Sequence, residues 1–491
     1  MIHDGIAPRG RQALLATLGL LLVPFLAHEA PAAPRMSTTP SWIVPGDQSN
    51  ALFGENAITA GDVDGDGFSD ILVGARTYAN GEASEGRMMI FRGGPSGVSS
   101  TPFRTYESDE VGAQYGASVA CLGDATGDGF DDVAVGAPAY GASDIGAVFV
   151  YKGSASGPPA GGANRTLLGD GIDNGGFGGW VSDAGDVNGD GFQDLLVGSS
   201  LYSNGQANEG RALLYLGAAG GVSTSASWIV ESNVVGARFG YRVSTAGDVN
   251  GDGFDDVLIG AVRFTNGQTT EGKAFLYLGS AAGLSTTPAW QVEGEQTGAN
   301  LGASLANAGD VNADGYADFL IGAQAYDNGN TNEGRVYLFL GSPTPISTTP
   351  ARTYEGNEDA ALLGTALGTA GDVNGDGYAD YLIGGSGFDA GGTNRGKAML
   401  FLGGGGTPPA SPAFTYLGPQ DGDSFADCAV TAGDIDADGY SDFLIGASHY
   451  DGAINEGARS SASKAPRQSP RRTRPGVRSG STPAISSGTG S

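Results

Sequence analysis

Seven nine-residue loops of the chain carry aspartates at fixed positions. Each has Asp at positions 1, 5 and 9, and position 3 is Asp or Asn in all except the second loop, which has Thr126. Side-chain oxygens at positions 1, 3, 5 and 9 can converge with the carbonyl of position 7, an oxygen-only ligand set that suits Ca²⁺. Gly at position 6 permits the sharp turn, and the apolar residue at position 2 should anchor the loop. The loops therefore predict up to seven Ca²⁺ ions, with the affinity of the Thr126 site left open.

The predicted ligands follow one pattern in every loop, with position 7 contributing its backbone oxygen. They are Asp62, Asp64, Asp66, Phe68 and Asp70; Asp124, Thr126, Asp128, Phe130 and Asp132; Asp186, Asn188, Asp190, Phe192 and Asp194; Asp248, Asn250, Asp252, Phe254 and Asp256; Asp310, Asn312, Asp314, Tyr316 and Asp318; Asp372, Asn374, Asp376, Tyr378 and Asp380; Asp434, Asp436, Asp438, Tyr440 and Asp442.

Two alternative roles for these loops fit the residues less well. An EF-hand needs Glu at position 12, where this chain has Val73, Val197 or Ile259. A turn of Asp, Asn and Gly that binds nothing would account for a single loop. It would not account for 21 aspartates at three fixed positions in seven loops, because their mutual repulsion needs a counter-ion.

The loops recur every 62 residues, as the step from Asp62 to Asp124 shows. In the fourth copy, strands are predicted at 241–246, 257–261, 273–278 and 289–292, with the Asp loop between the first two. Four short antiparallel strands repeated several times are typical of a β-propeller, in which radial stacking covers each sheet. We therefore predict an all-β, seven-bladed propeller of four-stranded antiparallel blades over residues 34–458.

The two ends of the chain differ from this repeat. Residues 41–44 align with the fourth strand at 289–292 and should complete the last blade. Residues 1–33 have Arg9 and Arg11 before an apolar run and a small-residue stretch, the layout of a secretory signal peptide. Residues 459–491 hold seven Arg or Lys and no acid, which predicts either a disordered basic tail or a shifted reading frame that degrades the last blade.

Composition limits the possible partners. The formal net charge is −29, which disfavours nucleic acid and anionic membrane surfaces and favours cations. No other segment could span a membrane, so we expect a secreted, extracellular monomer, with a periplasmic or cell-surface location as variants. Cys121 and Cys428 are expected to be buried free thiols because they lie at different offsets in distant repeats.

One frame of residues resembles a known family. Phe239-Gly240 and Gly260-Ala261, on either side of the Asp loop, resemble the FG-GAP repeat of integrin α subunits and of secreted bacterial proteins. The resemblance implies a seven-bladed propeller, calcium in the loop between the first and second strands, and partner binding on the opposite face. Two positions depart from the pattern: the family's closing Pro appears only as Pro138, and Ala426 replaces a Gly.

The opposite face should be formed by the connections between strands two and three and between strands four and one. An aromatic recurs there in every copy, at Tyr78, Tyr140, Tyr202, Phe264, Tyr326, Phe388 and Tyr450. These rings either wedge between blades or stack on sugars. A Glu-Gly pair also recurs, at Glu85, Glu209, Glu271, Glu333 and Glu456, and is expected to mark a turn.

Catalysis has little support in the sequence. His449 is the only histidine beyond the predicted signal peptide, which argues against a Ser-His-Asp triad or a histidine-based zinc site. The leading prediction is a calcium-binding propeller that binds or adheres to an extracellular protein or glycan, without enzymatic activity. A lectin-like propeller is the alternative, and a carboxylate-based hydrolase comes third.

Overall fold

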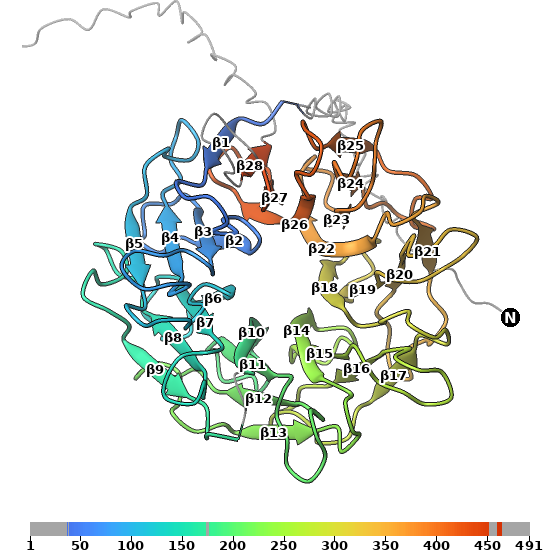
Figure 1. Cartoon of the computed structure of the whole chain (residues 1–491), viewed down its shortest axis with the longest axis horizontal. Coiled ribbons are helices and arrows are strands. Elements are labelled where there is room, and N and C mark those ends of the chain that lie inside the picture. The colour runs from blue at the N-terminus through green and yellow to red at the C-terminus, as the bar shows by residue number, and fades with distance from the viewer. Residues whose placement is uncertain (1–36, 38, 173–175, 451–458, 464–491) are drawn as a thin grey trace, which may run out of the picture. The chain divides into compact units, whose positions relative to one another are not determined.

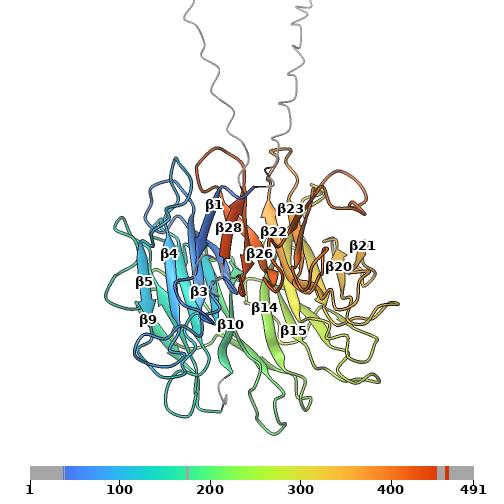
Figure 2. The ribbon, with the colours of Figure 1, turned by 45° about the horizontal axis from the view of Figure 1, so that its top comes forward.

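The computed structural model describes residues 37, 39–172, 176–450 and 459–463. Their strands form seven four-stranded antiparallel sheets, arranged in a ring (Figures 1 and 2). Six sheets use four consecutive strands each, and the seventh combines one early strand with three late ones. The chain is therefore an all-β propeller with six complete blades and a partial seventh sheet.

Each blade is ordered from the centre of the ring outward (Figure 1). The innermost strands are β2 (Ala57–Gly61), β6 (Ser118–Gly123), β10 (Phe177–Gly185), β14 (Phe239–Gly247), β18 (Ser304–Gly309), β22 (Leu363–Gly371) and β26 (Phe425–Gly433). The second strands are β3 (Asp70–Ala75), β7 (Asp132–Ala137), β11 (Asp194–Ser199), β15 (Asp256–Ala261), β19 (Asp318–Ala323), β23 (Asp380–Gly385) and β27 (Asp442–Ala447). The third strands are β4 (Arg87–Phe91), β8 (Ala147–Tyr151), β12 (Arg211–Tyr215), β16 (Lys273–Tyr277), β20 (Arg335–Phe339), β24 (Lys397–Phe401) and β28 (Arg459–Ser463). The outer strands are β5 (Arg104–Glu107), β9 (Arg165–Leu168), β13 (Trp228–Glu231), β17 (Trp290–Glu293), β21 (Arg352–Glu355), β25 (Phe414–Leu417) and β1 (Trp42–Pro45).

The sequence pattern explains these elements. Every second strand is a short apolar run bounded by the Asp loop, and all six of its residues are buried in each blade. A sheet covered on both faces requires such a continuous apolar run, whereas the outer strands alternate or expose residues. In the fourth blade, the predicted strands agree with β14 to β17 to within two residues at each end.

Glycines set the distance between neighbouring blades. A Cβ at Gly260 in β15 would lie 2.2 Å from the backbone oxygen of Gly302 in the next blade. The equivalent distances are 2.1 Å from Gly198 to Gly240 and 2.3 Å from Gly74 to Gly116. Any side chain at these second-strand positions would push the blades apart, which explains why Gly recurs there.

The apolar cores lie between blades. One cluster, for example, joins Leu214 and Trp228 of the third blade to Phe239, Ile259 and Tyr277 of the fourth. Within it, Trp228 meets Tyr277 edge to face, with ring centroids 5.1 Å apart. Because each core needs two blades, a blade buries its apolar faces only as part of the ring.

The seventh sheet extends beyond the predicted end of the propeller. We expected the repeat to stop at residue 458, but residues 459–463 form β28, which pairs with β27 on one side and β1 on the other. Sheet pairing uses backbone N–H and C=O groups, so a polar Arg-Ser-rich segment can complete a sheet that offers two partners. The predicted boundary is wrong for these five residues.

Backbone contacts also join the seventh sheet to the first blade. The amide of Ser69 donates to the oxygen of Asp434 (3.1 Å), and that of Gly94 to the oxygen of Ile435 (2.9 Å). The Cys428 thiol donates to the Ala57 oxygen (3.0 Å). Both cysteines are free, as predicted; Cys428 is buried, whereas Cys121 is only partly buried.

Some predictions fall outside the described residues. These include the signal peptide at residues 1–33, Glu456, and the part of the tail from residue 464 onward. Among the described residues, no helix is long and apolar enough to cross a membrane.

Candidate metal centre

The seven Asp loops each connect the first strand of a blade to its second. They therefore lie at the same end of their blades. The apolar position 2 is buried in each, as Val63 and Val249 illustrate with no exposed surface. The position 6 glycines have left-handed φ angles, +89° at Gly67 and +90° at Gly253, so the sharp turn predicted from Gly is confirmed.

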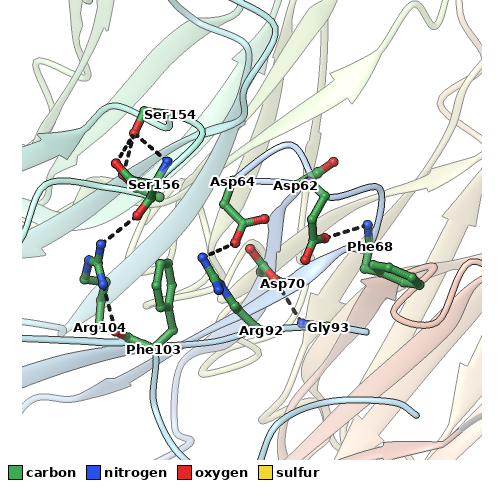
Figure 3. A network of polar contacts seen from close by, with 12 residues as sticks. Asp62, Asp64, Phe68, Asp70, Arg92, Gly93, Phe103, Arg104, Ser154 and Ser156 are labelled. Atoms are coloured by element: carbon green, nitrogen blue, oxygen red, sulfur yellow. Dashed lines mark hydrogen bonds and ion pairs between the residues drawn. The ribbon is translucent and has the colours of Figure 1, made fainter. Parts of the chain in front are cut away.

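The first loop brings three carboxylates together. Oxygens of Asp62, Asp64 and Asp66 lie within 4.8 Å of one another. Asp62 accepts hydrogen bonds from the amides of Asp66 (3.0 Å) and Gly67 (2.8 Å), which hold its side chain over the turn. This arrangement presents several oxygens to one point in space (Figure 3).

Two buried oxygens in this loop have no hydrogen-bond partner. Asp70 is fully buried; its Oδ1 accepts from the amide of Gly93 (2.9 Å), whereas its Oδ2 has no partner. Oδ1 of Asp64 is likewise buried and unpartnered. Burial raises the pKa of Asp70 to about 7, because the buried surroundings disfavour the charged carboxylate. A bound cation would supply the missing partner, and the residues therefore fit a hard metal ion.

The fourth loop shows how the predicted ligands are held elsewhere. Asp256 is buried, and its two oxygens accept from the amides of Gly279 (2.8 Å) and Val249 (3.0 Å). Asp248 accepts from the amides of Gly251 (2.7 Å) and Gly253 (2.8 Å). Burial raises the pKa of Asp256 to about 7. These carboxylates are thus fixed by backbone amides and keep lone pairs for a cation.

The loops differ in how closely their acids gather. Within the described chain, only the first and seventh loops place three carboxylates within 4.8 Å, the seventh with Asp434, Asp436 and Asp442. In the second loop, Thr126 is buried and its hydroxyl has no hydrogen-bond partner. The position 7 residues donate their amides to the position 5 carboxylates, as Phe68 does to Asp66 (3.1 Å); their carbonyls as ligands stay a prediction.

Two loops have a neighbouring basic side chain that we did not predict. Arg92 approaches Asp64 at 2.5 Å (Figure 3), and Lys152 approaches Asp128 at 3.0 Å. Both follow the third strand of their blade, where the next four blades have Leu216, Leu278, Leu340 and Leu402. The sequence could have revealed these bases, because one repeat position changes from Leu to Arg or Lys in the first two copies. A base beside the carboxylates competes with a metal ion, so these two loops should bind calcium less tightly.

Neighbouring loops are connected to each other. The ring of Tyr316 packs on the preceding loop, where a Cβ at Gly251 would lie 2.5 Å from its Cε1. Asp131, at position 8 of the second loop, accepts a hydrogen bond from the amide of Asp62 in the first (2.7 Å). Position 8 could not be recognised from the sequence because its residue type varies from copy to copy.

At the opposite end, five of the seven repeated aromatics, Tyr78, Tyr202, Phe264, Tyr326 and Phe388, lie beneath a base of their own blade. Tyr202 is 4% exposed, and the Cζ atom of Arg211 lies 3.9 Å from its ring centroid. Lys397 covers Phe388 in the same way at 3.4 Å. These cation–π contacts lie within single blades. Phe388 also belongs to the apolar core between the fifth and sixth blades, as the wedging prediction requires. The bases leave no open ring face for sugar stacking at Tyr202 or Phe388.

The single histidine of the propeller does not form a triad. The hydroxyl of Ser448 donates to Asp427 and also lies 3.0 Å from Nδ1 of His449. In a catalytic triad the imidazole lies between the hydroxyl and the carboxylate. Here the hydroxyl lies between the other two groups.

Comparisons with known proteins agree with this geometry. The FG-GAP repeat family model matches residues 56–87, 116–151, 178–215, 239–277, 301–339 and 429–461. The chain is 32% identical to integrin alpha-5 of Xenopus laevis over 171 residues, covering 33% of this chain and 16% of that protein. It is 29% identical to integrin alpha-V of Gallus gallus over 225 residues, covering 44% and 21%. Phosphatidylinositol-glycan-specific phospholipase D of Bos taurus is 32% identical over 205 residues, covering 38% and 24%.

A solved structure, the exotype rhamnogalacturonan lyase YesX, aligns with a TM-score of 0.40 and 13% identity over 88% of this chain and 74% of that one. The fold and its loops define a β-propeller with acidic, metal-competent turns. The chain belongs to the FG-GAP repeat propellers and is related to the integrin α subunits. It spans less than a quarter of the length of the curated relatives named above.

Proposed function

We propose that this protein is a secreted, calcium-stabilised seven-bladed propeller that binds an extracellular protein or glycan on the face opposite the Asp loops. The observation that carries the calcium site is the pair of buried, unpartnered carboxylate oxygens in the first loop, Asp64 Oδ1 and Asp70 Oδ2. In this proposal β1 and β28 complete the seventh blade.

The calcium ions have a structural role in this proposal. They neutralise carboxylates at the end of the ring where successive loops are hydrogen-bonded to each other. At a free concentration ten times its dissociation constant, one site contributes about 1.4 kcal/mol to the free energy of unfolding. Loops three to six, which have Leu rather than a base beside them, should be the tighter sites.

The opposite face has features of a binding surface. Val111 and Val235, in the connections that follow β5 and β13, are 66% and 69% exposed, and Ile172 in the equivalent connection after β9 is 44% exposed. In this proposal these three exposed apolar side chains contact the partner, because they occupy equivalent connections of three consecutive blades. The names of the integrin relatives are consistent with such a role.

Calcium binding and its structural role are tested with one loop variant. Asp252→Ala removes the position 5 ligand of the fourth loop and should remove one calcium equivalent in native mass spectrometry. The melting temperature should fall in millimolar calcium and stay unchanged in chelator, because the lost ligand acts through the ion. An unchanged stoichiometry would contradict calcium binding at this loop.

Partner binding is tested separately, by probing an array of glycans and cell-surface proteins with the protein in calcium and in chelator. Binding that is abolished by Val111→Asp and Val235→Asp, with the melting temperature retained, would support the proposed face. Binding that survives both changes would place the partner elsewhere.

A further inference from the structure

A second acidic cluster lies at the end of the first blade opposite the Asp loops. It consists of Glu85, Glu107 and Asp109, whose carboxylate oxygens lie within 4.8 Å of one another. Glu85 precedes β4, Glu107 ends β5, and Asp109 follows two residues later. The cluster therefore joins two connections of one blade, at the end that we assign to the partner.

Glu85 is the buried member of this cluster. Its side chain has no exposed surface; Oε1 accepts from the amide of Asn80, whereas Oε2 is buried without any hydrogen-bond partner. The recurrent Glu-Gly pair was predicted to mark a turn, and the Asn80 contact agrees with that. The turn uses one oxygen only, and an unpartnered carboxylate oxygen in the interior is destabilising unless a cation or donor reaches it.

In two sibling blades a base of the third strand neutralises the counterpart of Glu107, whereas in the third blade Arg211 binds Asp170 instead. In the fourth blade, Lys273 binds Glu293, the counterpart of Glu107, at 2.9 Å. In the fifth, Arg335 binds the counterpart Glu355 at 2.6 Å. These bases begin the third strand and face the end of the fourth across the sheet, as the pairs Lys273 with Glu293 and Arg335 with Glu355 in the strand register show.

The first blade lacks this internal neutralisation. Its base, Arg87, is register partner of Glu107 but binds Asp47, which follows β1 of the seventh sheet. Glu107 instead accepts a hydrogen bond from Nδ2 of Asn80 (2.9 Å). Within the described chain, no Lys or Arg pairs with any of the three acids of the cluster. The first blade therefore holds three neighbouring carboxylates without a base.

We propose that Glu85, Glu107 and Asp109 bind a hard divalent cation such as Ca²⁺. Three carboxylates at this spacing offer the oxygen-only ligands that calcium prefers. Glu107 is partly buried and Asp109 exposed, so the ion reaches the site from solvent and keeps coordination positions for water or for oxygens of a partner. The site is separate from the Asp loops and needs no partner to form.

Among the residues that the structure describes, only the first blade gathers three acids within 4.8 Å of one another at this end. Counterparts of Asp109 are Asn233 in the third blade and Asn357 in the fifth, while the second blade has Ile145 and Leu168 in place of the two glutamates. The fourth blade has all three acids, with Glu295 in the place of Asp109, and there Lys273 supplies the positive charge. One extra ion per chain is expected.

The test locates and counts that ion. Crystals of the full chain soaked in millimolar Mn²⁺ should show an anomalous peak between Glu85 and Asp109. Asp109→Asn should abolish this peak and weaken one site at least tenfold in calorimetric titration with Mn²⁺, without unfolding the protein, because Asn occupies the same place in two sibling blades.

Controls separate this site from the Asp loops. Glu85→Gln should remove the same peak, whereas Glu271→Gln, its counterpart beside Lys273, should leave the peak and the stoichiometry unchanged. Asp252→Ala removes a loop ion and leaves this one. Absence of the peak in the unchanged protein, or retention of the peak and of full affinity in Asp109→Asn, would overturn the proposal.

Discussion

The pKa and the stability of each buried carboxylate in this protein depend on which groups replace water around it. Asp70 and Asp256 are held by backbone amides and have a pKa raised by burial. Asp64 keeps an oxygen without a partner even though its other oxygen meets Arg92. Such buried carboxylates are destabilising unless they are neutralised, and a bound cation would stabilise them.

Asp427 provides a test of burial without a metal. Burial raises its pKa to about 6, against 3.8 for an exposed Asp, while Ser448 and His449 lower it and Glu55 raises it. The folded protein therefore holds this proton more tightly than the unfolded chain, and the stability from this group is lost as the pH rises from about 4 through 6.

Asp427→Asn should remove that loss, since Asn is never charged and can still accept from Ser448. The variant should match the wild type at pH 4 and exceed it above pH 6, by about 2 kcal/mol if each pKa unit counts for about 1.4 kcal/mol and partial exposure is discounted. Urea unfolding at pH 4, 5, 6 and 8 measures the difference. A gap that is the same at every pH would contradict the assignment.

The strands and loops of each blade have residue types that depend on contacts with the neighbouring blade. Second strands are buried throughout because neighbouring blades cover both faces. Glycine recurs in them because the next blade's backbone approaches, as at Gly260. In the last copy, Ala426 takes the place of a glycine and adopts a left-handed φ of +70°, so the departure from the repeat is accommodated at the cost of local strain.

Gly260→Ala should lower the free energy of unfolding by about 3 kcal/mol, because its Cβ would meet backbone, which cannot rotate away. Gly220→Ala is the matched control: a Cβ there meets nothing within 4 Å, and the change should stay within about 0.5 kcal/mol. Chemical denaturation of both variants in millimolar calcium gives the comparison. Equal effects would show that the blade spacing is not set by this glycine.

At the scale of the whole molecule, two features matter: the large negative net charge and the contacts that join the first blade to the seventh sheet. Seven calcium ions would change the formal net charge from −29 to −15, since seven ions bring fourteen charges. The ring closes through two kinds of contact: β1 pairs with β28, and backbone amides of the first blade bind oxygens of the last Asp loop. Ring closure therefore depends on both chain ends.

Trp42→Ala should weaken closure in particular. Trp42 in β1 donates from Nε1 to the Ser99 oxygen (3.0 Å) and meets Phe91 edge to face at 5.4 Å, so it anchors β1 to the first blade. Trp290 of the fourth blade donates in the same way to the oxygen of Ser347 in the fifth blade (3.0 Å). Both substitutions should cost about 3–5 kcal/mol, but only Trp42→Ala should speed hydrogen exchange in β26 and β27. Equal exchange in those strands would contradict a closing role for β1.

The sequence by itself determined the repeat, the strand order and the position of the Asp loops. These depend on local spacing: a period of two for strands, Gly for left-handed turns, and Asp at fixed offsets, all repeated in seven copies. Repetition made the prediction robust, since an error in one copy is corrected by six others. The loop anchors Val63 and Val249 were predictable for the same reason.

Only the tertiary structure decided which oxygens lack partners and which charges are already neutralised. Arg92 reaches Asp64, Arg87 turns to Asp47 and Arg211 covers Tyr202, and all three choices depend on a neighbouring strand or blade. Likewise, residues 459–463 form a strand because β1 and β27 offer backbone partners on both sides. Long side chains and sheet edges can contact several partners that are distant in sequence. The local sequence pattern does not show which of these contacts forms.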